Sequence, residues 1–460
     1  MSSHKQSCLF RIFKLKFVSG TCFSLLMLIL LLNIRLEVFQ GENVTWTAAN
    51  WWSFGKEAAD TEKGKETGPK HKDSIGFNMT NILMLKYPEL FTTIPHKTLP
   101  SYKNPCWIAN VPENVLDLNP YRNKRYDNRI KNKPKLMGKH LWESLTKKRT
   151  GHFRLRCMPY FYIIGMPKCG TTDLYYRLTQ HPDVVGGMVK EPHWWTRRRF
   201  HESFDLYLDL FDEAAVIIGN QKENSSHPTR NELDFHYVIT GEGSVTTLWD
   251  NTRWRKEFWD TTNNEPPILV ANILRAVQPH ARFIVTLRDP AERLFSEYLY
   301  VKRDISKTIE GFHKAVMFSI NGFNNCLKTR SVRACAYSPP AVIRRNVRVH
   351  LGLYEVFLRD WFSIFHRDQM LVLRLEDQSS NQRATMTKIF NFLNLGPIKD
   401  GINTEEIFGP GKKNRLPDNL RLGAMLQKTR SILQKFYFPY NRGLADLLND
   451  TRFLWLEKNL

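Results

Sequence analysis

The sequence predicts an α/β fold, a P-loop-like and mostly parallel sheet flanked by helices. Three apolar runs have the length of buried strands: Tyr160–Gly165, Arg282–Leu287 and Met370–Leu375. Each precedes a segment with helical spacing of apolar residues, namely Thr172–Gln180, Ala291–Lys302 and Arg383–Leu395. Successive strand–helix units favour parallel strands, and ligands bind beyond their carboxyl ends. We therefore expect Lys168, Arg288 and Glu376 to emerge at one edge of the sheet.

The first strand runs directly into a candidate anion-binding loop, Gly165-Met-Pro-Lys-Cys-Gly-Thr-Thr-Asp173. A glycine turn directs backbone N–H groups at one point, and the following helix adds the positive end of its dipole. Lys168 precedes Gly170, whereas the lysine of a nucleotide-triphosphatase loop follows the second glycine. The loop therefore predicts a site for an anion with several oxygens that departs from an ordinary ATP loop. Its candidate ligands are Lys168, Cys169, Gly170, Thr171, Thr172 and Asp173.

The second strand ends in Arg288-Asp-Pro-Ala-Glu-Arg-Leu-Phe-Ser296. Pro290 suits the first turn of a helix, so Arg288 at the strand tip points a guanidinium toward the edge that holds Lys168. Ser296 adds a hydroxyl about two turns later. The alternative is that Arg288 only pairs with Asp289 at the helix cap.

Between these strands lies Lys190-Glu-Pro-His-Trp-Trp195. We assign Glu191 as a general base, because a carboxylate beside the bound anion can take a proton from a hydroxyl that attacks the anion. The alternative is a structural ion pair with Lys190. The tryptophans form a wall for a sugar ring or pack in the core, and we hypothesise that their apolar surroundings offset the effect of Lys168 and Lys190 on Glu191. His193 orients a group or contacts the substrate, and the expected substrate contacts are Lys190, His193, Trp194 and Trp195.

The chain divides into five predicted parts: a cytoplasmic tail (1–16), a transmembrane signal anchor (17–34), a luminal stem (35–80), an irregular lead-in (81–156) and the catalytic domain (157–460). The apolar run is long enough to span a bilayer, and the basic residues before it favour a cytosolic N-terminus. A cleaved signal peptide, with its shorter apolar region, is the alternative. The net charge of +22 predicts a polyanionic partner. Because nucleic acid is excluded by luminal placement, we expect sulfated or carboxylated glycans.

Cysteines and glycosylation sequons agree with that compartment. We expect Cys326 to pair with Cys335 and Cys106 with Cys157, which leaves Cys169 as a free, structural thiol. The four sequons lie at Asn43, Asn78, Asn224 and Asn449. Neither His/Cys spacing nor paired carboxylates suggest a metal site.

Taken together, these segments resemble the N-acetylgalactosamine 4-sulfate 6-O-sulfotransferase family, of the carbohydrate sulfotransferase 15 type. The likeness runs from about Pro105 to the C-terminus and includes Pro-Lys-Cys-Gly-Thr-Thr, Lys-Glu-Pro-His-Trp-Trp, Leu248-Trp-Asp-Asn, Leu287-Arg-Asp-Pro and Leu373-Arg-Leu-Glu-Asp. The resemblance implies a Golgi type II membrane enzyme that moves a sulfuryl group from 3′-phosphoadenosine 5′-phosphosulfate (PAPS) to the 6-hydroxyl of 4-sulfated GalNAc in chondroitin or dermatan sulfate. Whether the protein forms a homo-oligomer stays open.

The resemblance also implies roles for individual residues. The loop of Lys168 holds the 5′-phosphosulfate, Arg288 and Ser296 hold the 3′-phosphate, and Glu191 is the base. A late basic loop folds over the nucleotide through Lys412, Lys413 and Arg415. Three alternatives stay open: a sulfotransferase for another glycan, a non-catalytic glycan-binding protein, and a P-loop kinase or nucleotidase. The position of Lys168 and the absence of a convincing Mg²⁺ aspartate argue against the last of these.

Overall fold

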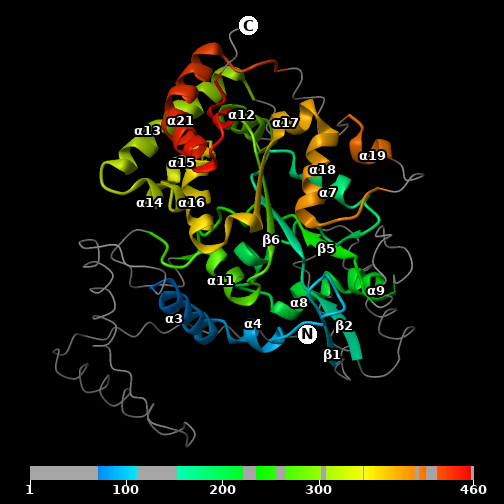
Figure 1. Ribbon diagram of the computed structural model, residues 1–460. Coiled ribbons are helices and arrows are strands. Elements are labelled where there is room, and N and C mark those ends of the chain that lie inside the picture. Colours follow the sequence, from blue (N-terminus) through cyan, green and yellow to red (C-terminus); the bar gives the residue numbers. More distant parts are fainter. Residues whose placement is uncertain are drawn as a thin grey trace, which may run out of the picture. The chain divides into compact units, whose positions relative to one another are not determined.

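The computed structural model describes residues 71–110, 153–220, 235–254, 265–301, 307–345, 347–398, 404–410 and 422–456. Its centre is a parallel sheet whose strands lie in the order β4-β5-β3-β6-β7. These strands are Val184–Gly186, Ile239–Glu242, Phe161–Gly165, Arg282–Leu287 and Met370–Arg374. The prediction of a mostly parallel sheet is therefore confirmed, and β3 and β6 are hydrogen-bonded neighbours (Figure 1).

Alternate residues of the strands contribute to two different cores, as the period of a strand requires. Tyr162 and Phe283 belong to the core that includes α11 (Val270–Val277) and α16 (Tyr354–Ile364). The residues that follow them, Ile163 and Ile284, belong to the core that includes α7 (Thr171–Leu178) and α18 (Gln382–Leu393). Helices thus cover both faces of the sheet, and only its edges and ends remain for ligands (Figure 1).

Beside the sheet, a third core joins helices that follow β6 in the chain. Its members are α12 (Pro290–Val301), α13 (Ile309–Leu327), α14 (Val332–Tyr337), α15 (Ala341–Arg345) and α21 (Gln427–Leu448). The disulfide between Cys326 and Cys335 ties the end of α13 to α14, as the sequence predicts. These helices position the segment that follows β6, which carries Arg288.

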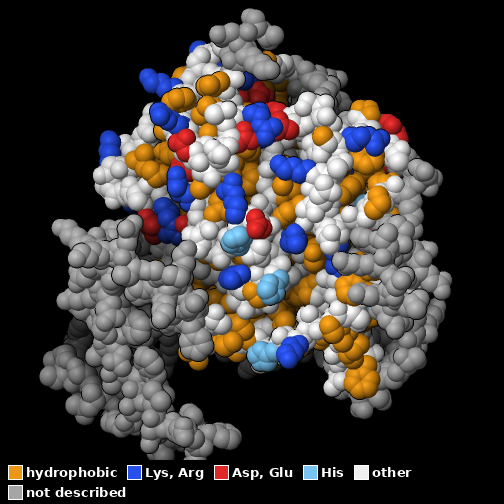
Figure 2. Space-filling view, viewed as in Figure 1, with side chains coloured by type: hydrophobic (Ala, Val, Ile, Leu, Met, Phe, Trp, Pro, Cys, Tyr) orange, Lys and Arg blue, Asp and Glu red, His pale blue; other side chains and the backbone are white. Residues whose placement is uncertain are grey.

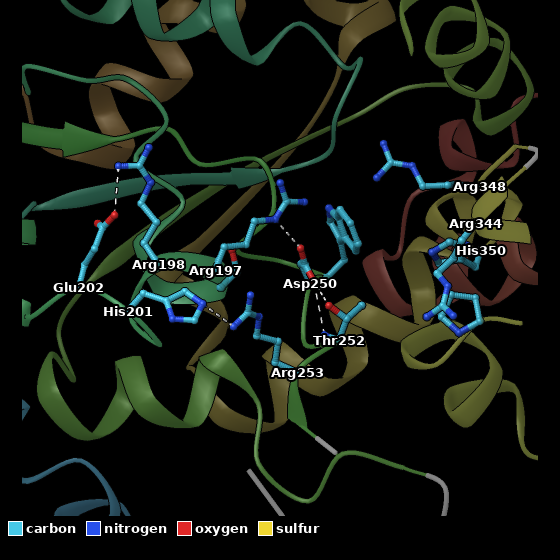
Figure 3. Close-up of a pocket in the computed structure, with 13 residues that line it drawn as sticks. Arg197, Arg198, His201, Glu202, Asp250, Thr252, Arg253, Arg344, Arg348 and His350 are labelled. Atoms are coloured by element: carbon cyan, nitrogen blue, oxygen red, sulfur yellow. Dashed lines mark hydrogen bonds and ion pairs between the residues drawn. The ribbon is translucent and has the colours of Figure 1, made fainter. Parts of the chain in front are cut away.

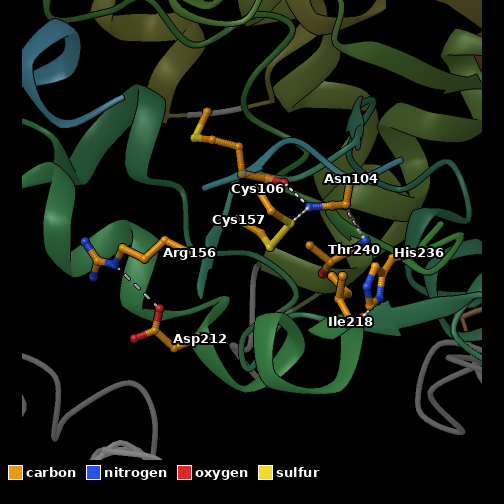
Figure 4. The surroundings of a disulfide bond; sticks show 9 residues. Asn104, Cys106, Arg156, Cys157, Asp212, Ile218, His236 and Thr240 are labelled. Carbon is orange, nitrogen blue, oxygen red and sulfur yellow. Dashed lines mark hydrogen bonds and ion pairs between the residues drawn. A yellow bond between two sulfur atoms is a disulfide. The ribbon is translucent and has the colours of Figure 1, made fainter. Parts of the chain in front are cut away.

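A short antiparallel ribbon pairs β1 (Cys106–Asn110) with β2 (Phe153–Cys157). Cys106 and Cys157 are directly opposite each other in this ribbon, and the predicted disulfide between them links the two strands (Figure 4). Asn104 fastens this ribbon to the sheet, because its Nδ2 donates to the Met158 carbonyl (2.8 Å) and its Oδ1 accepts from the Thr240 N–H (2.9 Å). Cys169 is a free cysteine, as expected.

The remaining described elements are short, apart from α3 (His71–Lys86). They are α4 (Pro88–Thr93), η2 (Trp194–Arg198), α8 (Phe204–Asp209), α9 (Asp212–Asn220), η3 (Val349–Gly352), η4 (Arg367–Gln369), α17 (Leu375–Ser380), α19 (Thr404–Phe408) and η5 (Thr451–Leu454). The lead-in predicted as irregular therefore contains regular elements, since α4, β1 and β2 lie within it. Helix α3 begins before residue 81, inside the segment predicted as the stem.

Several sequence predictions fall outside the described residues, including the anchor at 17–34, Asn43 and Asn224. Within the described ranges, no helix has the length and apolar character that crossing a membrane requires. Asn449 is exposed and ends α21, and Asn78 lies within α3.

Candidate active site

The predicted catalytic and cofactor-binding residues that the structure describes gather at the carboxyl ends of the strands. Because β3 lies between β5 and β6, the loop of Lys168 is flanked by both of their ends. Arg288 follows β6 directly. The segment after β4 returns to the end of β5, where the Gly243 N–H donates to the Lys190 carbonyl (2.9 Å). The structure thus brings Lys168 and Arg288 to one edge, as the strand assignments predict, and places Glu191 there as well.

The loop after β3 has the geometry of an anion cradle. Gly170 has a φ of 79°, and a Cβ there would lie 2.6 Å from Leu375 Cδ1, so only glycine fits. Lys168 also has a positive φ, 69°. Helix α7 begins at Thr171 without a side-chain cap, which leaves the N–H groups of its first turn available to an anion. The residues present therefore fit a phosphate or sulfate group.

The side chain of Lys168 lies over an aromatic ring of α12. Its Nζ is 4.0 Å from the centroid of Tyr300. Burial lowers the pKa of Lys168, and the nearby Arg288 guanidinium lowers it further, although Glu297 and Glu191 act in the opposite direction. Two cations close enough for their charges to repel each other form a site that favours a multiply charged anion.

The Arg288 guanidinium has an ion pair with Glu292, at 3.3 Å, so the alternative of pairing with Asp289 is not what the structure shows. Asp289 instead caps α12, since its Oδ1 accepts from the Ala291 N–H (2.8 Å). Tyr354 fixes the backbone of Arg288 by donating its hydroxyl to the Arg288 carbonyl (2.8 Å). Ser296 lies half-buried on the same helix. A rigid backbone with a partly exposed guanidinium suits recognition of a phosphate.

Glu191 is held as a carboxylate between two cationic or polar neighbours. Its Oε1 is in contact with Lys190 Nζ, and its Oε2 lies 3.4 Å from His193 Nε2. Burial alone would raise the pKa of Glu191, but the hydrogen bonds and charges of His193 and Lys190 outweigh it and lower the pKa to about 2. The ion pair with Lys190, which was the alternative to a general base, is therefore present in the free protein. It leaves Glu191 ionised, and a role as the base requires that its affinity for a proton rise when the substrate binds.

The tryptophans that follow do not line this site. Trp194 and Trp195 are 2% and 1% exposed, and their rings pack edge to face (5.0 Å) among the aromatic side chains of α8. Of the two alternatives, core packing is therefore the one observed, and neither ring offers a face to a sugar. The hypothesised offset is also incomplete, because burial acts to raise the pKa of Glu191 but His193 and Lys190 outweigh it.

Other predicted ligands have mainly local partners. Cys169 is fully buried, which raises the pKa of its thiol to about 12, so the thiol stays protonated. Asp173 accepts a hydrogen bond from Arg177 (2.6 Å), within α7. Glu376 lies in the first turn of α17, directly after β7, and its Oε1 accepts from the Asp289 N–H (2.9 Å), so it emerges at the edge that carries Arg288, as predicted. Lys412, Lys413 and Arg415 lie outside the described residues.

Two sets of charged residues lie near this edge and are not among the site residues predicted from the sequence. Glu242 ends β5, is 1% exposed, and accepts a hydrogen bond from the Tyr207 hydroxyl. On α12, the buried Arg293 pairs with Glu297 (2.8 Å), and Glu297 also pairs with Arg348. The spacing of Arg293 and Glu297 by four residues signals an ion pair on a helix. By contrast, β5 is only four residues long and contains glycine, which hides Glu242.

The face of the molecule around this edge is basic. In Figure 2, lysine, arginine and histidine side chains gather across the middle of the view, with few acidic side chains between them. Among the described residues no group of three or more His, Cys, Asp or Glu side chains is arranged to hold a metal ion.

A parallel sheet with an anion cradle after one strand and an arginine after its neighbour defines a class of enzymes that bind phosphosulfate nucleotides. The model of the sulfotransferase family matches residues 159–400, which include all five strands of the sheet, and the chain belongs to this family. The expectation of a PAPS-dependent enzyme is thereby confirmed.

Among curated relatives, the chain is 42% identical to human carbohydrate sulfotransferase 15 over 388 residues, covering 81% of this chain and 68% of that protein. The mouse carbohydrate sulfotransferase 15 is also 42% identical, over 390 residues, with the same coverage of both chains. More distantly, a bifunctional heparan sulfate N-deacetylase/N-sulfotransferase of Drosophila melanogaster is 21% identical over 318 residues, covering 63% of this chain and 26% of that protein. The resemblance drawn from the motifs is therefore confirmed.

Proposed function

We propose that this protein transfers a sulfuryl group from PAPS to a hydroxyl of a glycosaminoglycan, specifically the 6-hydroxyl of GalNAc 4-sulfate in chondroitin or dermatan sulfate. The similarity to carbohydrate sulfotransferase 15 supports a carbohydrate acceptor. The observation that carries the proposal is the meeting of Lys168, Arg288 and Glu191, since the charges of Arg288 and Glu191 both act on Lys168.

In this proposal the two phosphate ends of PAPS bind to different strand ends. The uncapped first turn of α7 would hold the 5′-phosphosulfate through its N–H groups and the hydroxyls of Thr171 and Thr172. Arg288 and Ser296 would hold the 3′-phosphate. Because β3 and β6 are neighbours, one nucleotide can reach both ends. The basic segment with Lys412, Lys413 and Arg415 remains a proposed cover for the nucleotide.

The chemistry follows from charge and position. The acceptor oxygen forms a bond to sulfur while the bond from sulfur to the 5′-phosphate oxygen breaks, and the hydroxyl proton passes to Glu191. Lys168 neutralises the charge that develops on the departing phosphate oxygen. His193 keeps the Glu191 carboxylate oriented through the 3.4 Å contact. The products are the sulfate ester and adenosine 3′,5′-bisphosphate.

A Golgi membrane location, with the catalytic domain in the lumen and the anchor at 17–34, is part of the same proposal. The two disulfides support it, because disulfides persist in oxidising compartments. The four sequons agree with it.

The test is transfer of labelled sulfate from PAPS to chondroitin, 4-sulfated chondroitin, dermatan sulfate and heparan sulfate, followed by disaccharide analysis of the products. We expect label at the 6-position of 4-sulfated GalNAc. We also expect Lys168→Ala and Glu191→Gln each to lower kcat by about 100-fold or more. Unchanged transfer by either variant would contradict the role of that residue, and glycan binding without any transfer would favour a non-catalytic glycan-binding protein.

A further inference from the structure

A basic cavity of about 650 Å³ is lined by residues of η2, of the segment after β5 and of the segment around η3 (Figure 3). This volume is within the range of pockets that bind small ligands. The lining contains two carboxylates, Glu202 and Asp250, against five arginines: Arg197, Arg198, Arg253, Arg344 and Arg348. The excess of positive charge makes an anionic occupant the one that fits.

The carboxylates that line the cavity do not neutralise all five arginines. Asp250 pairs with Arg197 at 2.8 Å. Arg253 contacts His201 (Nη1 to Nε2, 3.0 Å) and the ring of Phe200 (4.9 Å to the centroid), and has no ion pair with a carboxylate that the structure describes. Arg344 is exposed, and its guanidinium has no hydrogen bond or ion pair with a residue that the structure describes. In Figure 3 the guanidinium groups of Arg197 and Arg348 extend toward each other across the opening. Positive charge therefore remains for a ligand.

A buried histidine supplies a second, independent indication of a ligand. His350 lines the cavity, is only 2% exposed, and its Nδ1 has no hydrogen-bond partner among the described residues. A buried polar atom without a partner costs free energy unless a ligand or water satisfies it. Burial, together with the charges of Arg348, Arg293 and Arg344, holds the pKa of His350 well below its usual value. A neutral ring can donate one N–H to an ester oxygen.

The cavity is connected to the proposed catalytic groups through two of its walls. On one side, Thr196 Oγ1 lies 2.8 Å from Thr246 Oγ1, which in turn lies 2.8 Å from His193 Nδ1. On the other side, Arg348 pairs with Glu297, whose charge acts on Lys168. A chain bound in the cavity would therefore lie next to the residues that act on its hydroxyl.

We propose that this cavity binds a sulfate ester already present on the acceptor glycan, with Arg344, Arg348 and His350 as its principal partners. The inference rests on the proposed function and deepens it, because it assigns the preference for a sulfated acceptor to a particular set of side chains. An arginine fork can donate two parallel N–H groups to two oxygens of such an ester, which a single lysine cannot do.

The test compares two acceptors, unsulfated chondroitin and chondroitin 4-sulfate, with the wild type and three variants. Arg344→Ala removes a guanidinium that has no partner among the described residues, and Arg344→Lys keeps its charge. Arg275→Ala is the matched control. Arg275 is an exposed arginine on α11, which precedes the N-terminal end of β6, whereas the candidate site lies at the C-terminal end. Each variant is measured for kcat/KM and, with adenosine 3′,5′-bisphosphate bound, for equilibrium binding of a 4-sulfated and an unsulfated hexasaccharide.

For Arg344→Ala we expect kcat/KM and affinity to fall about tenfold with the 4-sulfated acceptor and less than about twofold with the unsulfated one. Arg344→Lys should fall in between, and Arg275→Ala should stay within about twofold for both. An equal loss with both acceptors would overturn the inference, because the cavity would then read the uronate carboxylates or charge in general. Wild-type enzyme that transfers sulfate to neither acceptor would instead contradict the proposed function.

Discussion

The ammonium group of Lys168 lies over the face of Tyr300, 4.0 Å from the ring centroid. Lys168 belongs to the loop after β3, and Tyr300 belongs to α12, which follows β6. The contact therefore joins the loop after β3 to the last turn of the helix that follows β6.

This contact predicts a measurable share of cofactor affinity. A cation–π contact at an exposed site is worth about 0.5–1 kcal/mol, so Tyr300→Leu should raise the KM for PAPS about twofold to fivefold. Tyr300→Phe keeps the ring face and is the control, with a KM near that of the wild type. Steady-state kinetics at a saturating acceptor concentration measure both. Equal KM values for the Leu variant and the wild type would show that the ring does not position Lys168.

The low pKa of Glu191 predicts how the loss of kcat in Glu191→Gln depends on pH. A group whose pKa is lowered to about 2 loses its proton-accepting form only as the pH falls toward that value. Glu191→Gln should therefore lower kcat by about 100-fold at every pH between about 5 and 8. Glu213→Gln, at an exposed carboxylate of α9, is the control with an unchanged kcat. A ratio of wild type to Glu191→Gln that collapses below about pH 6 would contradict an ionised Glu191.

Glu242 predicts a pH-dependent stability. Burial, and to a smaller extent the charge of Glu191, raise the pKa of Glu242 from 4.5 to about 7. Since the folded state then holds a proton that the unfolded state has released, stability falls as the pH rises from about 4.5 to about 7. At 1.36 kcal/mol per pKa unit this loss is of the order of 3 kcal/mol. Glu242→Gln should lack it.

Urea unfolding at pH 5 and pH 8 measures that difference. The free energy of unfolding of the wild type should fall between the two values by about 3 kcal/mol more than that of Glu242→Gln. Parallel changes in both proteins would mean that Glu242 titrates near its ordinary pKa.

The two disulfides should differ in what they contribute. They join cysteines separated by 51 residues (Cys106 and Cys157) and by nine residues (Cys326 and Cys335). On loop-closure entropy, replacing the first pair by serines should cost about 4 kcal/mol and replacing the second about 2.5 kcal/mol. Thermal unfolding of both double variants checks the order. A larger loss for the short loop would show that local packing, rather than chain entropy, sets the contributions.

The sequence predicts the parts of the fold that have strong apolar periodicity. The strands that carry Lys168 and Arg288 are long and buried, and the helices after them start at Thr171 and Pro290, as capping chemistry indicates. In contrast, β4 and β5 have three and four residues with glycine among them, too short for a periodic signal. Their position beside β3 comes from tertiary pairing, which sequence spacing does not encode.

The candidate site shows the same division. Lys168, Arg288 and Glu191 can be predicted as site residues because each belongs to a recognisable sequence motif. The burial of Trp194 and Trp195 was left open, because the same residues suit a core and a binding wall equally well. The cavity of Arg344, Arg348 and His350 is not predicted from the sequence, since its lining extends from Thr196 to His350 in the chain.

The most direct test of the account is the affinity of wild type and Arg288→Ala for adenosine 3′,5′-bisphosphate and for adenosine 5′-phosphate, measured by calorimetry. If Lys168 and Arg288 hold opposite ends of one nucleotide, Arg288→Ala should weaken binding of the bisphosphate by about 30-fold and of the 5′-phosphate by less than about threefold. Lys168→Ala should weaken binding of both ligands. A loss of equal size for the two ligands in Arg288→Ala would contradict the claim that Arg288 recognises the 3′-phosphate in a pocket shared with Lys168.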